Sequence, residues 1–308
     1  MGKLAVIIGP TGVGKTELSL RLAERWKCPI VNCDSRQIYK ELPIGTAAPT
    51  EEECKRVKHY FVGTHSLHES YNAGQYAREA VALLTSLSAQ ATENRPFAIL
   101  SGGSMLYLDA VCYGLDDIPS TDSYVREQLQ HQYQQYGIQW LQEQVKKADP
   151  DYYAEADCRN PQRLLHCLEV TLSAGKPYSS FRTRKRENRP WETIYIGLMR
   201  EREELYKRIN QRVNRMMAQG LETEARKAYE QLRNPSVLPN ALNTVGYREM
   251  VHFIRGDWSR EEVVRMIQQN SRHYAKRQMT WFRKRNDIHW IQMNQPIETI
   301  VEQIETFL

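Results

Sequence analysis

The segment Gly9 to Thr16, with the sequence GPTGVGKT, follows directly on the apolar run Leu4 to Ile8. Its spacing matches the P-loop signature G-x-x-x-x-G-K-[ST], a glycine-rich turn between a buried strand and a helix. In such a turn successive backbone N–H groups point at one spot, and the helix N-terminus adds partial positive charge. The segment therefore predicts an anion site of phosphate type. Its candidate residues are Gly9, Pro10, Thr11, Gly12, Val13, Gly14, Lys15 and Thr16.

Two residues of this segment have more specific expected roles. Lys15 is expected to reach the phosphate oxygens, and the Thr16 hydroxyl is expected to hold Mg²⁺. A P-loop alone is typical of a nucleotide-dependent kinase or NTPase, which also needs a second metal-binding carboxylate at a strand end. The strand predicted at 97–101 ends in Gly102-Gly103-Ser104 and offers no such carboxylate.

Apolar runs alternate with helical patterns along the first 115 residues. This alternation predicts an α/β fold of the P-loop NTPase type, in which helices cover both faces of a parallel sheet. The strands are expected at 4–8, 30–34, 59–63, 97–101, 194–198 and 288–291, and the main helices at 16–26, 72–87, 201–220 and 260–284. A helix-turn-helix region is expected between the last two helices, through 243–249.

The alternation stops near Leu115, and 122–175 is helical in pattern. Asn160 and Pro161 are expected to begin a helix with the stripe Leu164, Leu168 and Leu172, and Gly175 is expected to end it. The sequence thus predicts a P-loop α/β core made of 1–117 and 190–308, with a helical C-terminal part. An all-helical insertion is expected at 118–189.

Composition indicates the cellular compartment that we expect for the chain. Its six cysteines form no C-x-x-C pair, so free thiols in a reducing cytoplasm are expected and structural zinc is not. The apolar run at the N-terminus is too short for a signal peptide, and no stretch approaches the roughly 20 apolar residues of a membrane span. The formal net charge of +5 is only mildly basic.

Three features can carry chemistry around the predicted phosphate site. Asp34 follows the second strand, so its carboxylate is either a general base facing the site or an N-cap of the next turn. The pair Gly102-Gly103 suits either close approach by a ligand or a tight turn. Arg212, with Arg208 and Arg215 on the same predicted helix, either reaches a diphosphate or pairs with neighbouring glutamates.

Basic residues gather near the C-terminal end of the chain. The stretch 272–285 contains no acidic residue and interleaves Tyr274, Trp281 and Phe282 with its arginines and lysines. This pattern is compatible with a nucleic-acid contact, in which aromatic rings stack on bases, and also with a solvated helix face.

Several motifs together resemble the tRNA dimethylallyltransferase (tRNA isopentenyltransferase) family. They are GPTGVGKT at 9–16, DSRQIYK at 34–40, IGTAAP at 44–49, GGSMLY at 102–107, NPQRLLHCLEV at 160–170, RINQRV at 208–213, VGYREM at 245–250 and RHYAKRQMTWFR at 272–283. Ala48, Ser104 and Met105 stand where the family often has Lys, Thr and Gly. The absence of the zinc finger of eukaryotic members resembles the bacterial type.

The resemblance implies transfer of a dimethylallyl group from dimethylallyl diphosphate to N6 of the adenosine 3′ of the anticodon, with release of diphosphate. It implies that Lys15, Thr16 with Mg²⁺ and Arg212 stabilise the leaving group, and that Asp34 is the general base.

The resemblance also implies contacts to the anticodon stem-loop of tRNA. These residues are Asp34, Ser35, Arg36, Gln37, Ser104, Arg126, Gln162, Arg163, Leu164, Leu165, His166, Asn243, Thr244, Val245, Gly246, Tyr247, Arg248, Lys276, Arg277, Gln278 and Arg283. Leu164 and Leu165 are equally candidates for the core of the insertion. A monomer without membrane contact is expected.

Three other functions stay open at the level of sequence. They are isopentenyl transfer to a free adenine nucleotide, a P-loop kinase acting on a small molecule, and an RNA-binding protein with a vestigial P-loop.

Overall fold

The computed structural model describes residues 2–69, 71–91, 95–183, 186–232 and 238–308. The chain divides into two compact units, one formed by Met1–Tyr113 with Asn188–Leu308 and the other by Gly114–Glu187. These divisions fall a few residues from the boundaries expected at 117/118 and 189/190.

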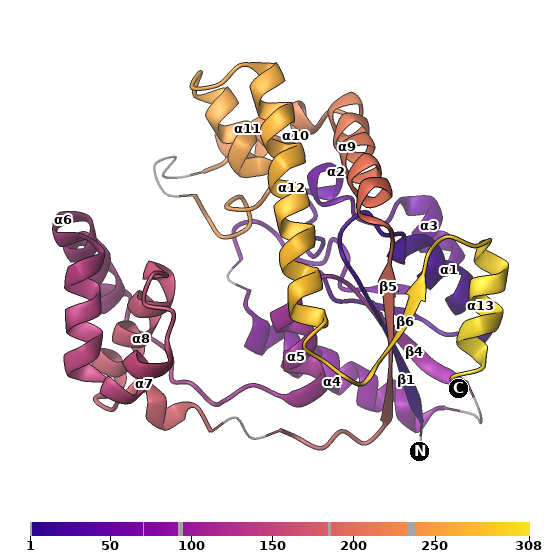
Figure 1. Cartoon of the computed structure of the whole chain (residues 1–308), viewed down its shortest axis with the longest axis horizontal. Helices are drawn as coiled ribbons and strands as arrows, with labels where there is room; N and C mark the ends of the chain where they lie inside the picture. The colour runs from indigo at the N-terminus through magenta and orange to yellow at the C-terminus, as the bar shows by residue number, and fades with distance from the viewer. Residues whose placement is uncertain (1, 70, 92–94, 184–185, 233–237) are drawn as a thin grey trace. The chain divides into compact units, whose positions relative to one another are not determined.

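The first unit is built on a six-stranded sheet in the order β3-β2-β4-β1-β5-β6 (Figure 1). Every pair of neighbouring strands is parallel. The strands are β1 (Lys3–Ile8), β2 (Ile30–Asn32), β3 (His59–Tyr60), β4 (Pro96–Ser101), β5 (Glu192–Met199) and β6 (Ile288–Gln292). In a parallel sheet the carboxyl ends of all strands lie at one edge, where ligands bind.

The two faces of the sheet are covered by different helices. Leu4, Val6 and Ile8 of β1 share a core with α4 (Ala73–Ala89) and α5 (Met105–Tyr113). Ala5 and Ile7 point to the opposite face and share a core with α1 (Lys15–Trp26) and α13 (Ile297–Glu305). Because side chains alternate along a strand, one strand anchors both layers. The predicted α/β fold with a doubly covered parallel sheet is confirmed.

Four helices of this unit were not expected from the sequence: α2 (Pro43–Thr46), α3 (Glu51–Arg56), α5 and α13. Both α2 and α3 are too short to show a period. The sequence of α5, MLYLDAVCY, is apolar almost all round, so it has no amphipathic period to recognise. In α13 the buried residues Ile300, Val301 and Ile304 do follow the helical spacing.

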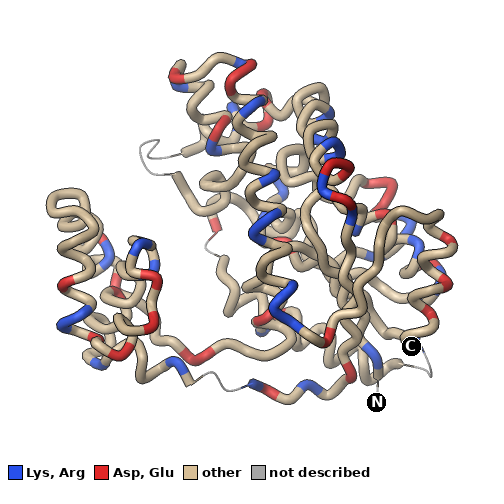
Figure 2. The backbone as a smooth tube through the Cα atoms, viewed as in Figure 1, with Lys and Arg blue, Asp and Glu red and all other residues tan. Residues whose placement is uncertain are grey.

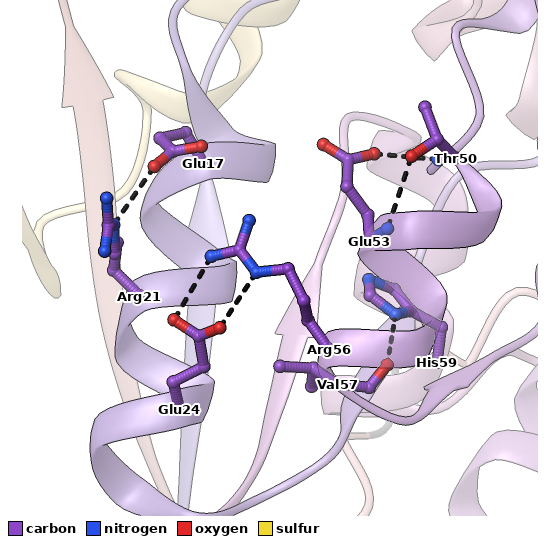
Figure 3. Close-up of polar contacts among 8 residues, drawn as sticks. All are labelled: Glu17, Arg21, Glu24, Thr50, Glu53, Arg56, Val57 and His59. Carbon is purple, nitrogen blue, oxygen red and sulfur yellow. Dashed lines mark hydrogen bonds and ion pairs between the residues drawn. The ribbon is translucent and has the colours of Figure 1, made fainter.

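Helices α1 and α3 are joined by side chains at the surface (Figure 3). Arg56 of α3 forms two hydrogen bonds with the carboxylate of Glu24 in α1, at 2.9 and 3.2 Å. Thr50 and Glu53 form a capping box that begins α3. These contacts fix the chain between β2 and β3 against the helix that follows the P-loop.

Four helices form the C-terminal part of this unit: α9 (Arg202–Ala218), α10 (Leu221–Glu230), α11 (Tyr247–Ile254) and α12 (Arg260–Phe282). The expected inward residues of α9, which are Leu205, Ile209, Val213 and Met216, are all buried. Helix α12 contacts α5, α9 and α11.

The second unit consists of α6 (Ser123–Ala148), α7 (Pro150–Glu155), α8 (Pro161–Ala174) and the 3₁₀ helix η1 (Tyr178–Phe181). As expected, Asn160 caps α8, Pro161 is its first residue and Gly175 ends it in the left-handed conformation. The predicted stripe is wrong at Leu172, which is 56% exposed. Among the described residues of both units, no helix combines the length and the apolarity needed to span a membrane.

Candidate active site

A cavity of about 620 Å³ opens at the carboxyl edge of the sheet in the first unit. Its walls come from the P-loop segment (Gly9–Thr16), the turn after β2, the end of α2, the turn after β4, helices α9 and α12, and residues 244–246. Segments distant in sequence converge here because each one follows a strand or packs beside that edge.

The P-loop segment has the backbone that its glycines predict. Gly9, Gly12 and Gly14 have φ values of 150°, 81° and 115°, a region that residues with a Cβ rarely occupy. Helix α1 then begins at Lys15. The Lys15 Nζ donates hydrogen bonds to the carbonyl oxygens of Gly9 at 2.9 Å and Pro10 at 3.0 Å.

Three side chains from later in the chain hold this segment. Arg200 donates from Nε to the Val13 carbonyl and Arg208 donates from Nε to the Gly12 carbonyl, both at 2.9 Å. The Thr11 N–H donates to Oε1 of Gln278 at 2.8 Å. The P-loop backbone is therefore fixed by the residue that follows β5, by α9 and by α12 together.

Two cations of the cavity wall, Lys15 and Arg212, act electrostatically on each other and on the Asp34 carboxylate. Burial, with the positive charge of Arg212, lowers the pKa of Lys15 to about 8, although Asp34 acts in the opposite direction. Burial also lowers the pKa of Arg212, and Asp34 again acts in the opposite direction. An anion bound between Lys15 and Arg212 would offset the cost of desolvating two like charges.

Arg212 is held by the backbone and not by a glutamate. Its Nη2 donates to the carbonyl oxygen of Thr46 at 3.2 Å. Within the described ranges, no carboxylate forms an ion pair with Arg212. The guanidinium therefore keeps donors for a ligand, which favours the diphosphate alternative over the helix ion pair.

The Asp34 side chain orders the turn that follows it and also lines the cavity. Residues 35–38 form a turn and not a helix, and Oδ1 of Asp34 accepts a hydrogen bond from the Arg36 N–H at 2.9 Å. The same side chain lines the cavity and acts electrostatically on Lys15 and Arg212. One carboxylate oxygen orients the group, which leaves the other for a ligand.

The neighbours of Asp34 are tied to the facing walls. Ser104 Oγ accepts a hydrogen bond from the Ser35 N–H at 2.8 Å. Gln37 donates to the carbonyl oxygens of Thr46 and Ala47, at 3.1 and 3.0 Å. The four predicted contacts Ser35, Arg36, Gln37 and Ser104 all line the cavity.

Gly102 and Gly103 are required by contacts within the protein. A Cβ on Gly102 would lie 2.1 Å from the Cys33 carbonyl oxygen, and one on Gly103 would lie 2.3 Å from Nε2 of Gln278. Neither glycine has a φ in the left-handed region. Close approach is the reason for this pair, although the approaching atoms belong to Cys33 and Gln278.

The metal expected at Thr16 finds few protein ligands. No cluster of three or more His, Cys, Asp or Glu side chains occurs in the part of the chain that the structure describes. The Thr16 hydroxyl and the Asp34 carboxylate both line the cavity. This oxygen donor set fits Mg²⁺, which commonly takes one or two protein ligands and completes its shell with phosphate oxygens and water.

Comparison with known proteins agrees with this architecture. Residues 37–285 match the family model described as IPP transferase. The chain belongs to the IPP transferase family. It is 52% identical over 287 residues to tRNA dimethylallyltransferase 2 of Porphyromonas gingivalis, with 93% of each chain covered.

Two further comparisons span the whole length. The chain is 48% identical to tRNA dimethylallyltransferase 1 of Bacteroides fragilis, with 96% of each chain covered. The crystal structure of the tRNA isopentenylpyrophosphate transferase of Bacillus halodurans is similar with a TM-score of 0.71 at 33% identity, covering 100% of this chain and 95% of that one.

Four residues that the family resemblance implied as RNA contacts have buried side chains that make contacts inside the protein. Leu164 and Leu165 are 0% and 3% exposed and pack in the core of the second unit. Tyr247 is fully buried and donates its hydroxyl to Glu224 and to the Leu42 carbonyl. Gln278 is 1% exposed, with its amide bonded to the P-loop and to Gly103. A motif match does not reveal which way a side chain points, and an RNA contact by any of these four residues stays a prediction.

The other predicted contacts of this IPP transferase divide between the two units. Thr244, Val245 and Gly246 line the cavity, whereas Asn243 and Arg248 are exposed outside it. Lys276, Arg277 and Arg283 are exposed on α12 and at its end, and Figure 2 shows blue lysine and arginine positions along this helix. Gln162, Arg163 and His166 are exposed on α8 of the second unit. Arg126, also in that unit, donates to Glu169 and Thr121.

Sequence reasoning missed several residues of the cavity wall. Ser271 and Tyr274 of α12 line it together with Ile267 and Gln278. Their spacing of four, three and four residues is that of one helix face, so this signal was present in the sequence. Arg200 has no comparable signal, because its role depends on meeting the Val13 carbonyl from another strand.

The pKa of Lys15 predicts how anion binding depends on pH. Because the free protein loses the Lys15 proton near pH 8 and a bound anion keeps it, binding above that pH requires proton uptake. The dissociation constant for inorganic diphosphate should therefore rise above pH 8, approaching tenfold per pH unit. Calorimetry between pH 7 and 9.5 measures it, and Lys15→Met provides the reference for titration of the ligand itself. If the ratio of the dissociation constants of the unaltered protein and Lys15→Met does not change with pH, the pH dependence does not come from Lys15.

Tyr247→Phe tests the contacts of that side chain inside the protein. Glu224 also accepts from the Ile44 and Gly45 N–H groups, both at 2.8 Å, so loss of the Tyr247 hydroxyl weakens the link between α10, α11 and α2. We expect the free energy of unfolding to fall by about 1–2 kcal/mol, measured by denaturant titration. Tyr136→Phe, at a residue 56% exposed, is the matched control. A large loss of tRNA affinity at unchanged stability would instead support an RNA contact by Tyr247.

Proposed function

We propose that this chain is a tRNA dimethylallyltransferase. It transfers a dimethylallyl group from dimethylallyl diphosphate to N6 of the adenosine 3′-adjacent to the anticodon, and it releases diphosphate. The observation that carries the proposal is one cavity in which the P-loop and Arg212 face Asp34, in a chain about half identical to curated tRNA dimethylallyltransferases.

The donor half of the reaction belongs to the P-loop side of the cavity. As the C–O bond to diphosphate breaks, negative charge builds on the leaving group. Lys15, the P-loop N–H groups and Arg212 are positioned to stabilise that charge. Thr16 would hold Mg²⁺, which when bound neutralises part of the charge of the diphosphate.

The acceptor half belongs to the turn after β2. The adenine N6 is a weak nucleophile because its lone pair is delocalised into the ring. As the new C–N bond forms, one N6 proton passes to the Asp34 carboxylate, which acts as general base. The adenine has to leave its stack in the tRNA loop to reach Asp34. Ser35, Arg36, Gln37 and Ser104 line the part of the cavity that the adenine would occupy.

The anticodon stem-loop is the proposed partner of the exposed basic and polar residues. On the first unit these are Asn243, Arg248, Lys276, Arg277 and Arg283, and on the second unit Arg126, Gln162, Arg163 and His166. Readers of RNA sequence mostly bind single-stranded loops. All six cysteines are free thiols, and we propose that the protein acts as a monomer in the cytoplasm.

The cavity disfavours a kinase. The strand β4 ends at Ser101, whose Oγ is hydrogen bonded to Ser19 Oγ at 2.8 Å, and no carboxylate follows it. A P-loop kinase needs an acidic residue there for its metal. Transfer to free adenylate uses the same chemistry, so substrate preference has to decide between these two acceptors.

One assay separates these functions. The protein is incubated with radiolabelled dimethylallyl diphosphate and either unmodified tRNA or AMP, and separately with ATP and RNA. Label in tRNA alone supports the proposal. Label in AMP would replace it with the adenylate enzyme, and phosphate release from ATP would replace it with a kinase or NTPase.

Asp34→Asn tests the general base. The amide keeps the hydrogen bond from the Arg36 N–H but accepts no proton at neutral pH. We expect single-turnover transfer to fall by about 10² or more while the tRNA dissociation constant changes little. Turnover equal to that of the unaltered enzyme would remove Asp34 from this role.

Arg163→Glu tests the proposed RNA face of α8. Reversal of an exposed charge that contacts phosphate should raise the tRNA dissociation constant several-fold and reduce its salt dependence by about one or two ions. Filter binding at several salt concentrations measures both quantities. Lys147→Glu, at an exposed residue of α6 in the same unit, is the control for charge alone. Equal effects of the two variants would contradict a specific contact at Arg163.

A further inference from the structure

Gln278 occupies an unusual position for a residue of a basic, surface-exposed helix segment. Its neighbours Lys276 and Arg277 are exposed, whereas Gln278 is 1% exposed. Its Oε1 accepts from the Thr11 N–H of the P-loop at 2.8 Å, and its Nε2 donates to the Gly103 carbonyl at 2.9 Å. One amide thus joins the P-loop to the turn after β4.

The turn after β4 continues this connection to the proposed base. The Ser104 N–H donates to the Cys33 carbonyl at 3.3 Å, and Ser104 Oγ accepts from the Ser35 N–H at 2.8 Å. In the sequence, Asp34 lies between Cys33 and Ser35, and both of these residues are hydrogen bonded to Ser104. The path from the P-loop to Asp34 therefore runs through Gln278, Gly103 and Ser104.

The chemistry of the contact requires an amide. Thr11 offers a donor and Gly103 offers an acceptor, so the bridging group has to accept at one end and donate at the other. An apolar side chain leaves the Thr11 N–H without this acceptor, and it leaves the Gly103 carbonyl with only the hydrogen bond from the Tyr274 hydroxyl at 3.3 Å. Gly103 itself is adapted to this bridge, because its absent Cβ would lie 2.3 Å from Nε2 of Gln278.

We infer that Gln278 is a positioning residue that fixes the distance between the diphosphate site and the general base. The inference rests on the proposed function, because that function assigns the P-loop end of the bridge to dimethylallyl diphosphate and the Asp34 end to the adenosine that accepts the dimethylallyl group. Without the bridge, Arg200 and Arg208 still hold Val13 and Gly12, but Thr11 loses its connection to the turn after β4 and so to Asp34. Displacements of about 1 Å from reacting geometry can reduce rates by about 10².

The main test compares Gln278→Met with the unaltered enzyme. Methionine keeps the volume and length of the side chain but forms neither hydrogen bond. We expect the dissociation constant for inorganic diphosphate with Mg²⁺ to rise about tenfold and kcat for transfer to fall by about 10–10². The tRNA dissociation constant should stay within about twofold. Gln268→Met on the same helix, whose side chain bonds to Asn214 away from the cavity, is the matched control.

A double-mutant cycle keeps the test independent of folding losses. Gly103→Ala should lower transfer strongly, because the new Cβ displaces Gln278. In a Gln278→Ala background that Cβ has space, so the same Gly103→Ala change should cost little more. Non-additivity of this kind indicates direct coupling of the two residues. Additive losses would overturn the inference.

The outcomes separate this inference from the proposed function. If the unaltered enzyme transfers no label to tRNA, the proposed function fails, while diphosphate binding by the Gln278 variants still reports on the P-loop. If transfer occurs and Gln278→Met lowers only thermal stability, with diphosphate affinity and kcat per folded molecule unchanged, Gln278 is an ordinary packing residue and the inference fails.

Discussion

Desolvation of two cations in one cavity governs the organisation of this protein. Lys15 and Arg212 line the cavity together with Asp34, and burial lowers the pKa of both cations. Like charges out of water are costly unless an anion joins them. The protein tolerates this arrangement because carbonyl groups of the backbone accept from both: Gly9 and Pro10 from Lys15, and Thr46 from Arg212. A dianionic group placed between them would complete the electrostatic balance.

The sheet explains why these charges meet. The P-loop follows β1 and Asp34 follows β2, and β4 lies between these strands in the order of the sheet. The turn after β4 thus separates the two, which places Gly102 against Cys33 and Gly103 against Gln278. A Cβ on Gly102 would force the Cys33 backbone away from the end of β4, and one on Gly103 would displace the Gln278 side chain. Small residues at this turn therefore set the width of the cavity.

The parallel sheet, the P-loop and the strand-end position of Asp34 could be predicted from the sequence. The P-loop spacing identified β1, α1 and Lys15, and the alternation of strands and helices gave the parallel sheet. The strand-end position of Asp34 placed it at the same edge. These inferences succeed because they depend on local periodicity and on one topological rule, namely that the carboxyl ends of parallel strands share an edge.

What could not be predicted was the direction of individual side chains within a recognised motif. Tyr247 lies in a motif associated with RNA, yet its hydroxyl contacts Glu224, a residue 23 positions earlier on another helix. No local pattern encodes that meeting. Leu164 and Leu165 were ambiguous for the same reason, and burial assigns them to the core of the second unit. Short or uniformly apolar helices such as α2 and α5 escape recognition because neither displays a period.

Helix α12 shows how one element serves two environments. Ile267, Ser271, Tyr274 and Gln278 repeat every three or four residues and line the cavity. Lys276 precedes Gln278 by two residues, a rotation of about 200° in an α-helix, and so it is exposed on the far side. The basic composition of the segment does not by itself reveal that some of its residues line the cavity and others are exposed. The helical period separates the residues that position the chemistry from those free to meet a polyanion, and the same 3.6-residue rule that builds the helix assigns each side chain to one of these tasks.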